Sequence, residues 1–577
     1  MLDLLRWLLG VPVLAFLLYA PGAVVLNSLS ARGHGRAFFA GVDEWLFSAV
    51  LISFLTTGLI AFILAEVGLF HWWLILGLVA LVSLLVGIWL GGTRHGLSSL
   101  LRLLAVPPAY PRRAVEGRLS RYQSWALIAL ILVAGVLFSR PAEMLRGALD
   151  SGAYVNAGVA LARNGSIIQR DRLLRELDND RGEIPELLLD LNDDRFTLDK
   201  LRMPAFYVFD KQAAEVLPQH YNLYPVWIAL LHSLFGIWGA LYATPLLAML
   251  AALAVYFFAR RALGSGPALV ALLLLVLCPV TIWFARYPVS EVITALLAFS
   301  AFFAFVRMVQ LASDKSVRGD ADTQDQYAFA SDDARLPWSL LWGVISGACL
   351  GQIALARPDF IFYLAPVPAY LLYWRLSRRW RPAYTWFTST LGAFLLLYLV
   401  HFVFYSFAYT LDLYHNSLQH ARRLWGPLLA AFYAGVALLI VVDRLYPRLK
   451  PLWVRVESLA ARYRRVWVGA LILGLAVYVL YNYLYAPWQP NNRQDDAGNV
   501  IPQAIATSWE SYIGAPVDEG SRFNLVRIGW YLSPIGLLLG AAGLLRWTWD
   551  RLNAATSLFF MSVLISGFVF IQETYTS

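Results

Sequence analysis

Long apolar runs separated by short polar or basic segments are the dominant pattern along the chain. A helix that crosses a membrane needs roughly 20 mainly apolar residues, and runs of that length predict about fourteen spans. They centre on residues 4–27, 45–67, 72–92, 123–139, 238–259, 267–284, 289–311, 338–356, 358–375, 385–407, 426–443, 466–485, 530–546 and 553–571. We therefore expect an all-α polytopic membrane protein.

Composition supports this class. The chain has 577 residues, of which 59% are hydrophobic and 14% charged, whereas soluble domains have about 45–50% apolar and about 25% charged residues. Cys278 and Cys349 both lie in apolar runs, which excludes a disulfide framework or a cysteine zinc cluster. The net charge of +9 does not indicate a nucleic-acid partner, because basic residues also mark the cytoplasmic loops of membrane proteins.

The distribution of Lys and Arg predicts the orientation of the spans. Basic residues collect in the loops 93–122, 376–382 and 444–465, whereas the loops 68–71, 285–288 and 408–424 carry few. With about fourteen spans, all the basic loops fall on one side, which we expect to be cytoplasmic. Both chain ends then lie outside. Because the last predicted span ends close to Ser577, we also expect a missing or separate C-terminal part.

Two long connections, 140–237 and 486–529, then face outward. The first is too apolar for a loose tail, and we expect it to form short helices and turns on the membrane surface. Ordered loops over a rigid scaffold often carry the functional residues, so we expect the active site on this side. We divide the chain into residues 1–122, which hold extra helices and a basic loop, and a core at 123–577.

Ionisable residues close to a bilayer are costly and often functional, and four motifs place them on the outer side. The motifs are Asp150-Ser151-Gly152, followed by a helix that ends at Asn164-Gly165; His220-Tyr221-Asn222-Leu223-Tyr224-Pro225; Arg286-Tyr287-Pro288-Val289-Ser290-Glu291; and Arg357-Pro358-Asp359. Each has a structural alternative. Asp150 is a suitable N-cap. His220, taken alone, is better interpreted as a surface histidine on an interfacial segment, and each arginine has a carboxylate close enough for a local ion pair.

The order of these motifs resembles the GT-C superfamily of membrane glycosyltransferases, in particular bacterial members similar to protein O-mannosyltransferases and the lipid A aminoarabinose transferase. The resemblance covers roughly residues 123–360 and leaves out the helices of 4–92. It implies an inverting transferase that moves a sugar from a polyprenyl-phosphate donor to an acceptor outside the membrane. The chain departs from the family in having Asp150-Ser151 where an Asp-Glu pair is common.

The resemblance also implies roles for individual residues. Asp150 corresponds to the catalytic base, and His220, Arg286 and Arg357 to residues that bind the donor phosphate. Glu291 and Asp359 would support these cations or ligate a divalent metal ion, whose requirement stays open. We expect aromatic residues to line the cavity for sugar and acceptor, namely Tyr154, Tyr221, Tyr224, Tyr287 and Trp509.

The resemblance implies a bacterial inner-membrane protein whose partners are membrane lipid, a polyprenyl-phosphate sugar and a glycan, lipid or protein acceptor. Two alternatives remain. One is that the chain is a catalytically silent scaffold or a subunit of a larger membrane complex. The other is a transporter, which is less consistent with charges at the rim and with the lack of an internal repeat.

Overall fold

The computed structural model describes most of the chain up to residue 410 and parts of the remainder. The described residues are 2–31, 39–91, 104–106, 119–143, 150–172, 174–176, 188–190, 200–202, 206–210, 213–312, 332–364, 366–407, 409–410, 490–494 and 500–504, with scattered positions between 430 and 481. The chain forms two compact units. The first comprises Met1–Phe360 and Arg381–Leu411, and the second Ile361–Trp380 and Asp412–Ser577.

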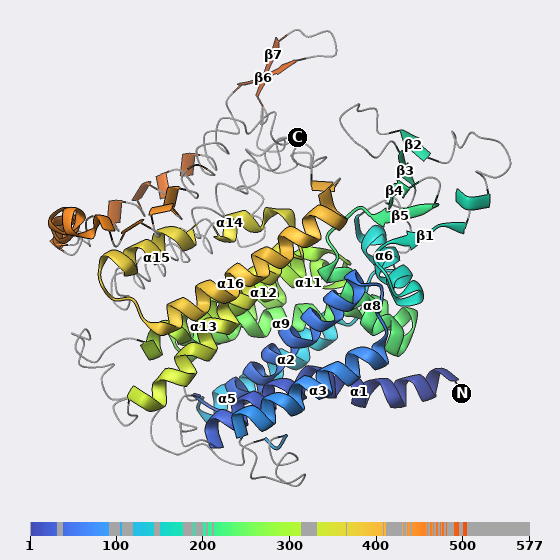
Figure 1. Cartoon of the computed structure of the whole chain (residues 1–577), viewed down its shortest axis with the longest axis horizontal. Coiled ribbons are helices and arrows are strands. Elements are labelled where there is room, and N and C mark those ends of the chain that lie inside the picture. The colour runs from blue at the N-terminus through green and yellow to red at the C-terminus, as the bar shows by residue number, and fades with distance from the viewer. Residues whose placement is uncertain are drawn as a thin grey trace. The chain divides into compact units, whose positions relative to one another are not determined.

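Long apolar helices form the first unit (Figure 1). Eight described helices are long and apolar enough to cross a membrane. They are Arg6–Leu29 in α1 (Leu2–Leu29), Val42–Glu66 (α2), Trp72–Leu90 in α3 (Trp72–Gly91), Arg121–Phe138 (α5), Ile237–Leu263 (α9), Ser290–Ala312 (α12), Leu336–Ala354 in α13 (Asp332–Ala354), and Pro382–Ser406, which is α16 (Pro382–His401) and the turn after it. The predicted multi-pass helical membrane protein is thereby confirmed, and each of these spans matches a predicted run.

Two further helices supply a ninth candidate span. The helices α10 (Ser265–Leu277) and α11 (Pro279–Arg286) meet at an angle of 64°. Pro279 opens α11, where its missing N–H costs nothing because no intrahelical acceptor is available. The chain also turns sharply before α9 and before α10. Gly236, between α8 (Leu223–Phe235) and α9, and Gly264, between α9 and α10, have φ of 69° and 95°, in the region that favours glycine.

The other predicted spans differ in outcome. The run 358–375 begins with η5 (Pro358–Phe360) and continues as α14 (Ile361–Leu364) and α15 (Pro366–Leu376), with residue 365 outside the described residues, so the span predicted there stays a prediction. The predicted spans 426–443 and 466–485 are described only in fragments, and 530–546 and 553–571 lie outside the described residues.

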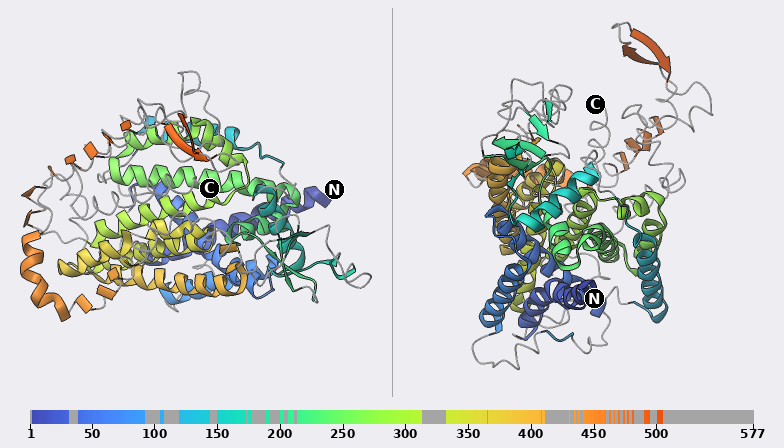
Figure 2. Two further views of the ribbon diagram at one scale, coloured as in Figure 1. Left: turned by 90° about the horizontal axis from the view of Figure 1, so that it is seen from above. Right: turned by 90° about the vertical axis from the view of Figure 1, so that its right-hand side faces the viewer.

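The long connection 140–237 contains a sheet, which corrects the prediction of short helices and turns alone. The strands β1 (Gln169–Arg170), β2 (Leu188–Asp190), β3 (Lys200–Arg202), β4 (Phe206–Asp210) and β5 (Glu215–Pro218) are antiparallel in the order β1-β5-β4-β3-β2. Aromatic and β-branched residues favour strands, and Phe206, Val208 and Val216 pack against Ala157 of α6 (Asp150–Asn164). The sheet lies beside α6 in all views (Figure 2).

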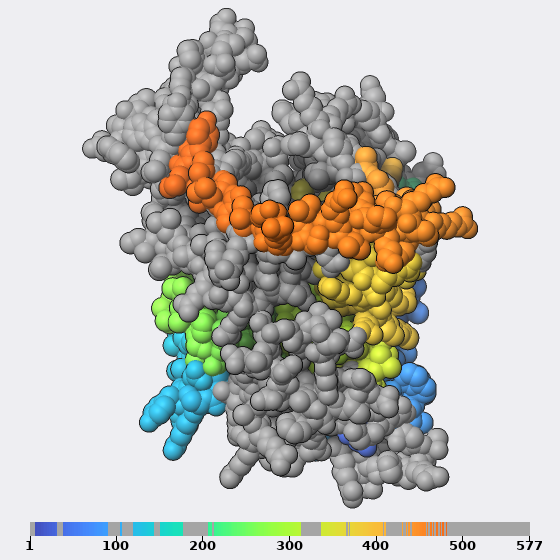
Figure 3. All heavy atoms as spheres, turned by 90° about the vertical axis from the view of Figure 1, so that its left-hand side faces the viewer, coloured from blue at the N-terminus to red at the C-terminus, as the bar shows by residue number. Residues whose placement is uncertain are grey.

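The helices before residue 123 pack as part of the first unit. Helix α1 contacts α2, α3 and α8, and α2 contacts α8. The rings of Phe54 and Trp227 stack at 4.3 Å with 5° between their planes. In contrast, little of α5 is buried, and part of it is seen at the surface (cyan in Figure 3). The predicted division at residue 122 is therefore not a boundary between the two units.

In the second unit, α14 contacts α15, and β6 (Pro490–Gln494) pairs with β7 (Val500–Ala504) as an antiparallel pair within the connection 486–529. Trp453 donates a hydrogen bond from its indole to Ser377 Oγ at 3.3 Å, and its ring lies 5.7 Å from that of Tyr373.

Candidate functional site

The motifs that contain Asp150, His220 and Arg357 meet in the first unit, together with Ser290 and Glu291 at the end of the motif that begins at Arg286. Asp150 begins α6, and His220 lies two residues before Asn222, the N-cap of α8. Glu291 is in the first turn of α12, and Arg357 follows α13 (Asp332–Ala354) directly before η5. Because all these positions are at or near helix ends, side chains from distant segments of the chain reach one another. Figure 1 shows the elements that carry them.

Asp150 and His220 form the first pair of the site. His220 Nε2 lies 3.5 Å from Asp150 Oδ1, and the exposed fractions of the two side chains are 7% and 79%. The predicted alternative of a surface histidine is therefore wrong. Among the described residues, neither ring nitrogen of His220 has a hydrogen-bond partner of good geometry. A buried, unsatisfied imidazole beside an exposed carboxylate is a place for a polar ligand or water.

Two aromatic rings hold His220 in place. Tyr154 stacks on it with the ring centroids 4.5 Å apart, and Tyr409 meets it edge-on at 5.0 Å. Burial raises the pKa of both tyrosine hydroxyls well above the ordinary value, so both remain protonated at neutral pH. The rings fix the imidazole plane and leave the side of Asp150 accessible.

Two hydrogen bonds join Tyr154, the ring that stacks on His220, to an arginine. Tyr154 Oη lies 2.9 Å from Ser290 Oγ, and Arg357 donates from Nη1 to the same Ser290 oxygen at 3.4 Å. Tyr154 therefore connects α6 with α12, and Ser290 connects α12 with the turn after α13. The predicted cavity residue Tyr154 belongs to the site, as part of its wall.

Arg357 lies between two carboxylates. Its Nη1 is 2.5 Å from Glu291 Oε1, and its Nε is 2.9 and 3.0 Å from the two oxygens of Asp359. Burial opposes the charge of Arg357, but Asp359 and Glu291 outweigh it, and the pKa of the guanidinium is raised. Asp359 is 13% exposed and Glu291 is 49% exposed. The predicted local ion pair between Arg357 and Asp359 is confirmed, and Asp359 is its more deeply buried partner.

The charge balance of the site is negative. Asp150, Glu291 and Asp359 carry three negative charges and Arg357 one positive charge, which leaves −2 when His220 is neutral. His220, aided by Arg357, lowers the pKa of Asp150 below its ordinary value of 3.8, while partial burial opposes this. Asp150 is thus ionised at neutral pH and can accept a proton.

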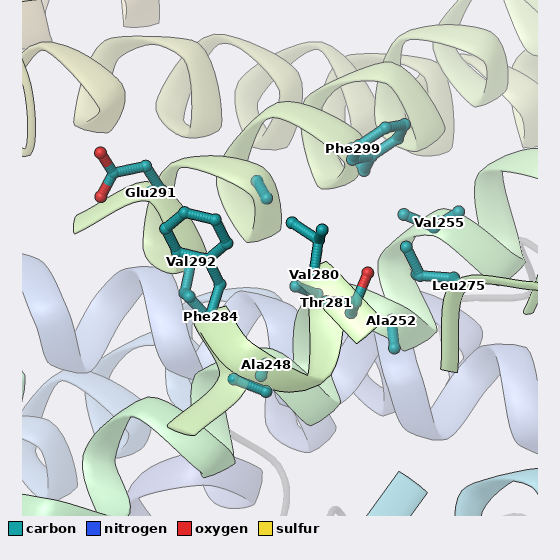
Figure 4. A pocket seen from close by; sticks show the side chains of 13 residues that line it. Ala248, Ala252, Val255, Leu275, Val280, Thr281, Phe284, Glu291, Val292 and Phe299 are labelled. Atoms are coloured by element: carbon teal, nitrogen blue, oxygen red, sulfur yellow. The ribbon is translucent and has the colours of Figure 1, made fainter. Parts of the chain in front are cut away.

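An apolar cavity of about 220 Å³ begins at Glu291. Glu291 and Val292 lie at one end of it, and Leu275 and Val255 at the other (Figure 4). Its walls come from α9, α10, α11 and α12, and the lining residues are Ala248, Ala251, Ala252, Val255, Leu275, Val280, Thr281, Phe284, Ala285, Glu291, Val292, Ala295 and Phe299. A single carboxylate at the end of an apolar cavity suits an amphiphilic ligand, with its polar group near Arg357.

Other predicted residues have different surroundings. Arg286 donates from Nε to the carbonyl of Leu137 at 2.7 Å, which secures the end of α5. Tyr287 stacks on Trp283. Tyr221 Oη lies 2.8 Å from Thr410 Oγ1, and Tyr224 Oη 2.6 Å from Thr244 Oγ1. Trp509 lies outside the described residues. A phosphate-binding role of Arg286 remains a prediction.

Two residues of the site were not assigned from the sequence. Ser290 stands inside a quoted motif, but its hydroxyl gives no signal of its own beside Arg286 and Glu291. Tyr409 follows a predicted span, where aromatic residues are common at the lipid–water boundary. Its contact with His220 depends on the packing of distant helices.

The described residues contain no group of three or more His, Cys, Asp or Glu side chains arranged to hold a metal ion. Glu291 and Asp359 instead share Arg357. No protein-family model, curated protein or solved structure matches the chain significantly. The function is therefore inferred from the side chains of the site and their arrangement.

Proposed function

We propose that the chain is an inverting membrane glycosyltransferase of the GT-C type, which moves a sugar from a polyprenyl-phosphate donor to an acceptor hydroxyl. The observation that carries the proposal is an exposed, ionised Asp150 in contact with the buried His220, joined through Tyr154 and Ser290 to Arg357. An apolar cavity that begins at Glu291 supports a donor with a hydrocarbon tail. In this proposal the chain has about fourteen spans, and the site faces outward.

The reaction needs one base and one stabilised leaving group. Asp150 takes the proton of the acceptor hydroxyl as its oxygen forms the new bond to the anomeric carbon. The bond from that carbon to the phosphate oxygen breaks on the opposite face, and polyprenyl phosphate leaves with the electron pair. A positioned general base contributes about 10²–10⁴ in rate.

The cation at the leaving phosphate is Arg357. Because the site has a charge of −2 with a neutral His220, a phosphate must displace a carboxylate or bring a counterion. Glu291 is the carboxylate that can move, since it is half-exposed, whereas the buried Asp359 keeps Arg357 in place. A guanidinium suits phosphate because of its planar fork of donors. A divalent cation between Glu291 and the phosphate would serve the same purpose.

The test is sugar transfer or release by the full chain in lipid, against a panel of polyprenyl-phosphate sugars, with and without a chelator. We expect Asp150→Asn to lower kcat by about two decades or more while donor binding is kept. Val280→Phe, which fills the apolar cavity, should weaken donor binding. Val270→Phe is the matched control, because Val270 on α10 is 56% exposed and does not line the cavity.

Turnover by Asp150→Asn at the parent's rate would exclude Asp150 as the base. If no donor is turned over, and Asp150→Asn and Val280→Phe both bind lipid-linked sugar as the parent does, the transferase proposal fails. The chain would then be better described as a scaffold or subunit of a membrane complex.

A further inference from the structure

A second set of polar side chains is buried between α2 and the end of α16. His401 Nδ1 lies 2.9 Å from Glu66 Oε1, and His401 Nε2 lies 2.8 Å from Ser406 Oγ. His401 is fully buried, and Glu66 and Ser406 are nearly so. With Glu66 ionised, the Nδ1–H donates to the carboxylate, and Nε2 accepts from the serine hydroxyl. Both ring nitrogens are thereby satisfied.

An unusual backbone turn makes this contact possible. Residues Phe402–Ser406 form a π-helical turn that continues α16. A π-turn brings residues five positions apart into register, and His401 and Ser406 have this separation. Such turns are rare, costly to maintain, and frequent at functional sites. The hydrogen bond from Ser406 to His401 therefore stabilises a turn that an ordinary α-helix would replace.

The π-turn leads directly into the candidate site. Thr410 donates to the carbonyl of Ser406 at 2.7 Å and lies 2.8 Å from Tyr221 Oη. Tyr409, the residue before Thr410, packs edge-on against both His220 and Tyr221. The side chains next to His220 on this side are therefore placed by the turn that begins at His401.

The end of α2 also holds the helix that carries Asp150. The N–H of Phe70 donates to the carbonyl of Gly165 at 2.9 Å, and the N–H of Ile167 donates to the carbonyl of Ala65 at 3.3 Å. Gly165 directly follows α6 and has a φ of 76°. The segment around Glu66 thus contacts both elements that flank the Asp150–His220 pair, namely α6 and the turn after α16.

We propose that Glu66 is a positioning residue of the transferase site, acting through His401 and the π-turn to hold Tyr409 against His220. The inference rests on the proposed function for its catalytic consequence, but the positioning itself does not. It gives α2, which lies outside the resemblance to known transferases, a part in the site. Ser406 is not a nucleophile in this proposal, since it is 2% exposed and has no access for a substrate.

The positioning is tested without turnover by placing 3-fluorotyrosine at position 409 of the full chain in lipid and recording its ¹⁹F spectrum. We expect Glu66→Ala to shift or broaden this resonance, because His401 then loses its acceptor and the π-turn its support. Glu66→Gln keeps an acceptor oxygen and should restore a spectrum close to that of the parent. Glu44→Gln is the matched control. Glu44 is a buried, ion-paired glutamate near the opposite end of α2, where it accepts from Arg261 Nε at 2.7 Å.

Turnover supplies the second readout. Glu66→Ala should lower kcat by about 10- to 100-fold, the effect of a small misplacement of catalytic groups, and change KM by less than about twofold. Glu66→Gln should recover most of kcat. An unchanged ¹⁹F resonance in Glu66→Ala, or the same change in Glu44→Gln, would overturn the positioning role. A shifted resonance in a parent protein that turns over no donor would leave the positioning intact and refute the transferase instead.

Discussion

The two carboxylates around Arg357 should differ in their free energy of interaction with its guanidinium. The exposed fractions of the side chains give the expected order. Removing one partner of a buried ion pair costs about 3–5 kcal/mol, because the remaining charge is left without compensation. Arg357 is 22% exposed and Asp359 13% exposed. Residues in contact within one ion-pair network have couplings of about 0.5–3 kcal/mol, and we expect this largely buried pair at the upper end, about 2–3 kcal/mol. Glu291 is 49% exposed, and its coupling should stay below about 1 kcal/mol.

Double-mutant cycles measure these couplings. The variants are Arg357→Met, Asp359→Asn and Glu291→Gln, each alone and in the two pairs with Arg357→Met, with the free energy of unfolding determined by denaturant titration in mixed micelles. The cycle removes the effect of each substitution on its own. Added salt should reduce the Glu291 coupling more than the Asp359 coupling, since exposed charges are screened more strongly.

A coupling of Glu291 equal to or larger than that of Asp359 would refute the reasoning from burial. It would also contradict the role proposed for Glu291, which must release Arg357 when a phosphate enters. The short distance of 2.5 Å between Arg357 Nη1 and Glu291 Oε1 makes this a demanding test, because distance alone would rank Glu291 first.

Two other predictions concern α6. Gly158→Ala should destabilise the protein by about 1–3 kcal/mol, because an added Cβ would lie 2.5 Å from a side-chain carbon of α8. Gly135→Ala on α5, where an added Cβ meets open space, should be neutral or slightly stabilising when both variants are compared by the same denaturant titration, and an equal loss in both variants would contradict the argument. Folding lowers the pKa of Asp150, so its ionised form stabilises the folded state above the ordinary pKa of 3.8, and this contribution is lost as the pH falls through the lowered pKa. The difference in Tm between the parent and Asp150→Asn should therefore be present at neutral pH and disappear as the pH falls through the lowered pKa; a difference that persists unchanged once Asp150 is protonated would exclude the assigned cause.

The spans and the meeting of the motifs were predictable from the sequence for simple physical reasons. Apolar runs of sufficient length have few alternatives to a spanning helix, and the eight described spans follow them. The end of α6 at Asn164, with Gly165 at a positive φ, follows from the ordinary stop signal of a helix. Costly charges beside apolar segments indicated Asp150 and Arg357. The structure brings these two motifs into one cluster through the stacking of Tyr154 on His220 and the hydrogen bonds to Ser290.

Features that depend on tertiary packing were not predictable. The strand character of Phe206–Asp210 is decided by the partner strands and by α6, which a single run of apolar residues does not reveal. The burial of His220 between Tyr154 and Tyr409 requires three distant segments. Arg286 had a carboxylate nearby in the sequence but instead donates to the carbonyl of Leu137, a partner 149 positions away.

The burial of α2 indicates that the N-terminal helices are a structural part of the candidate site. In its spanning window, 67% of α2 is buried, against 17% for α5, although both are apolar. An added Cβ at Gly58 would lie 3.2 Å from the indole nitrogen of Trp227, so α2 and α8 approach closely at this point. An accessory helix needs no such contact, since lipid can cover its apolar side chains equally well. The close packing of α2, together with the buried Glu66 at its end, is better explained by a requirement for rigidity where α6, α8 and α16 meet.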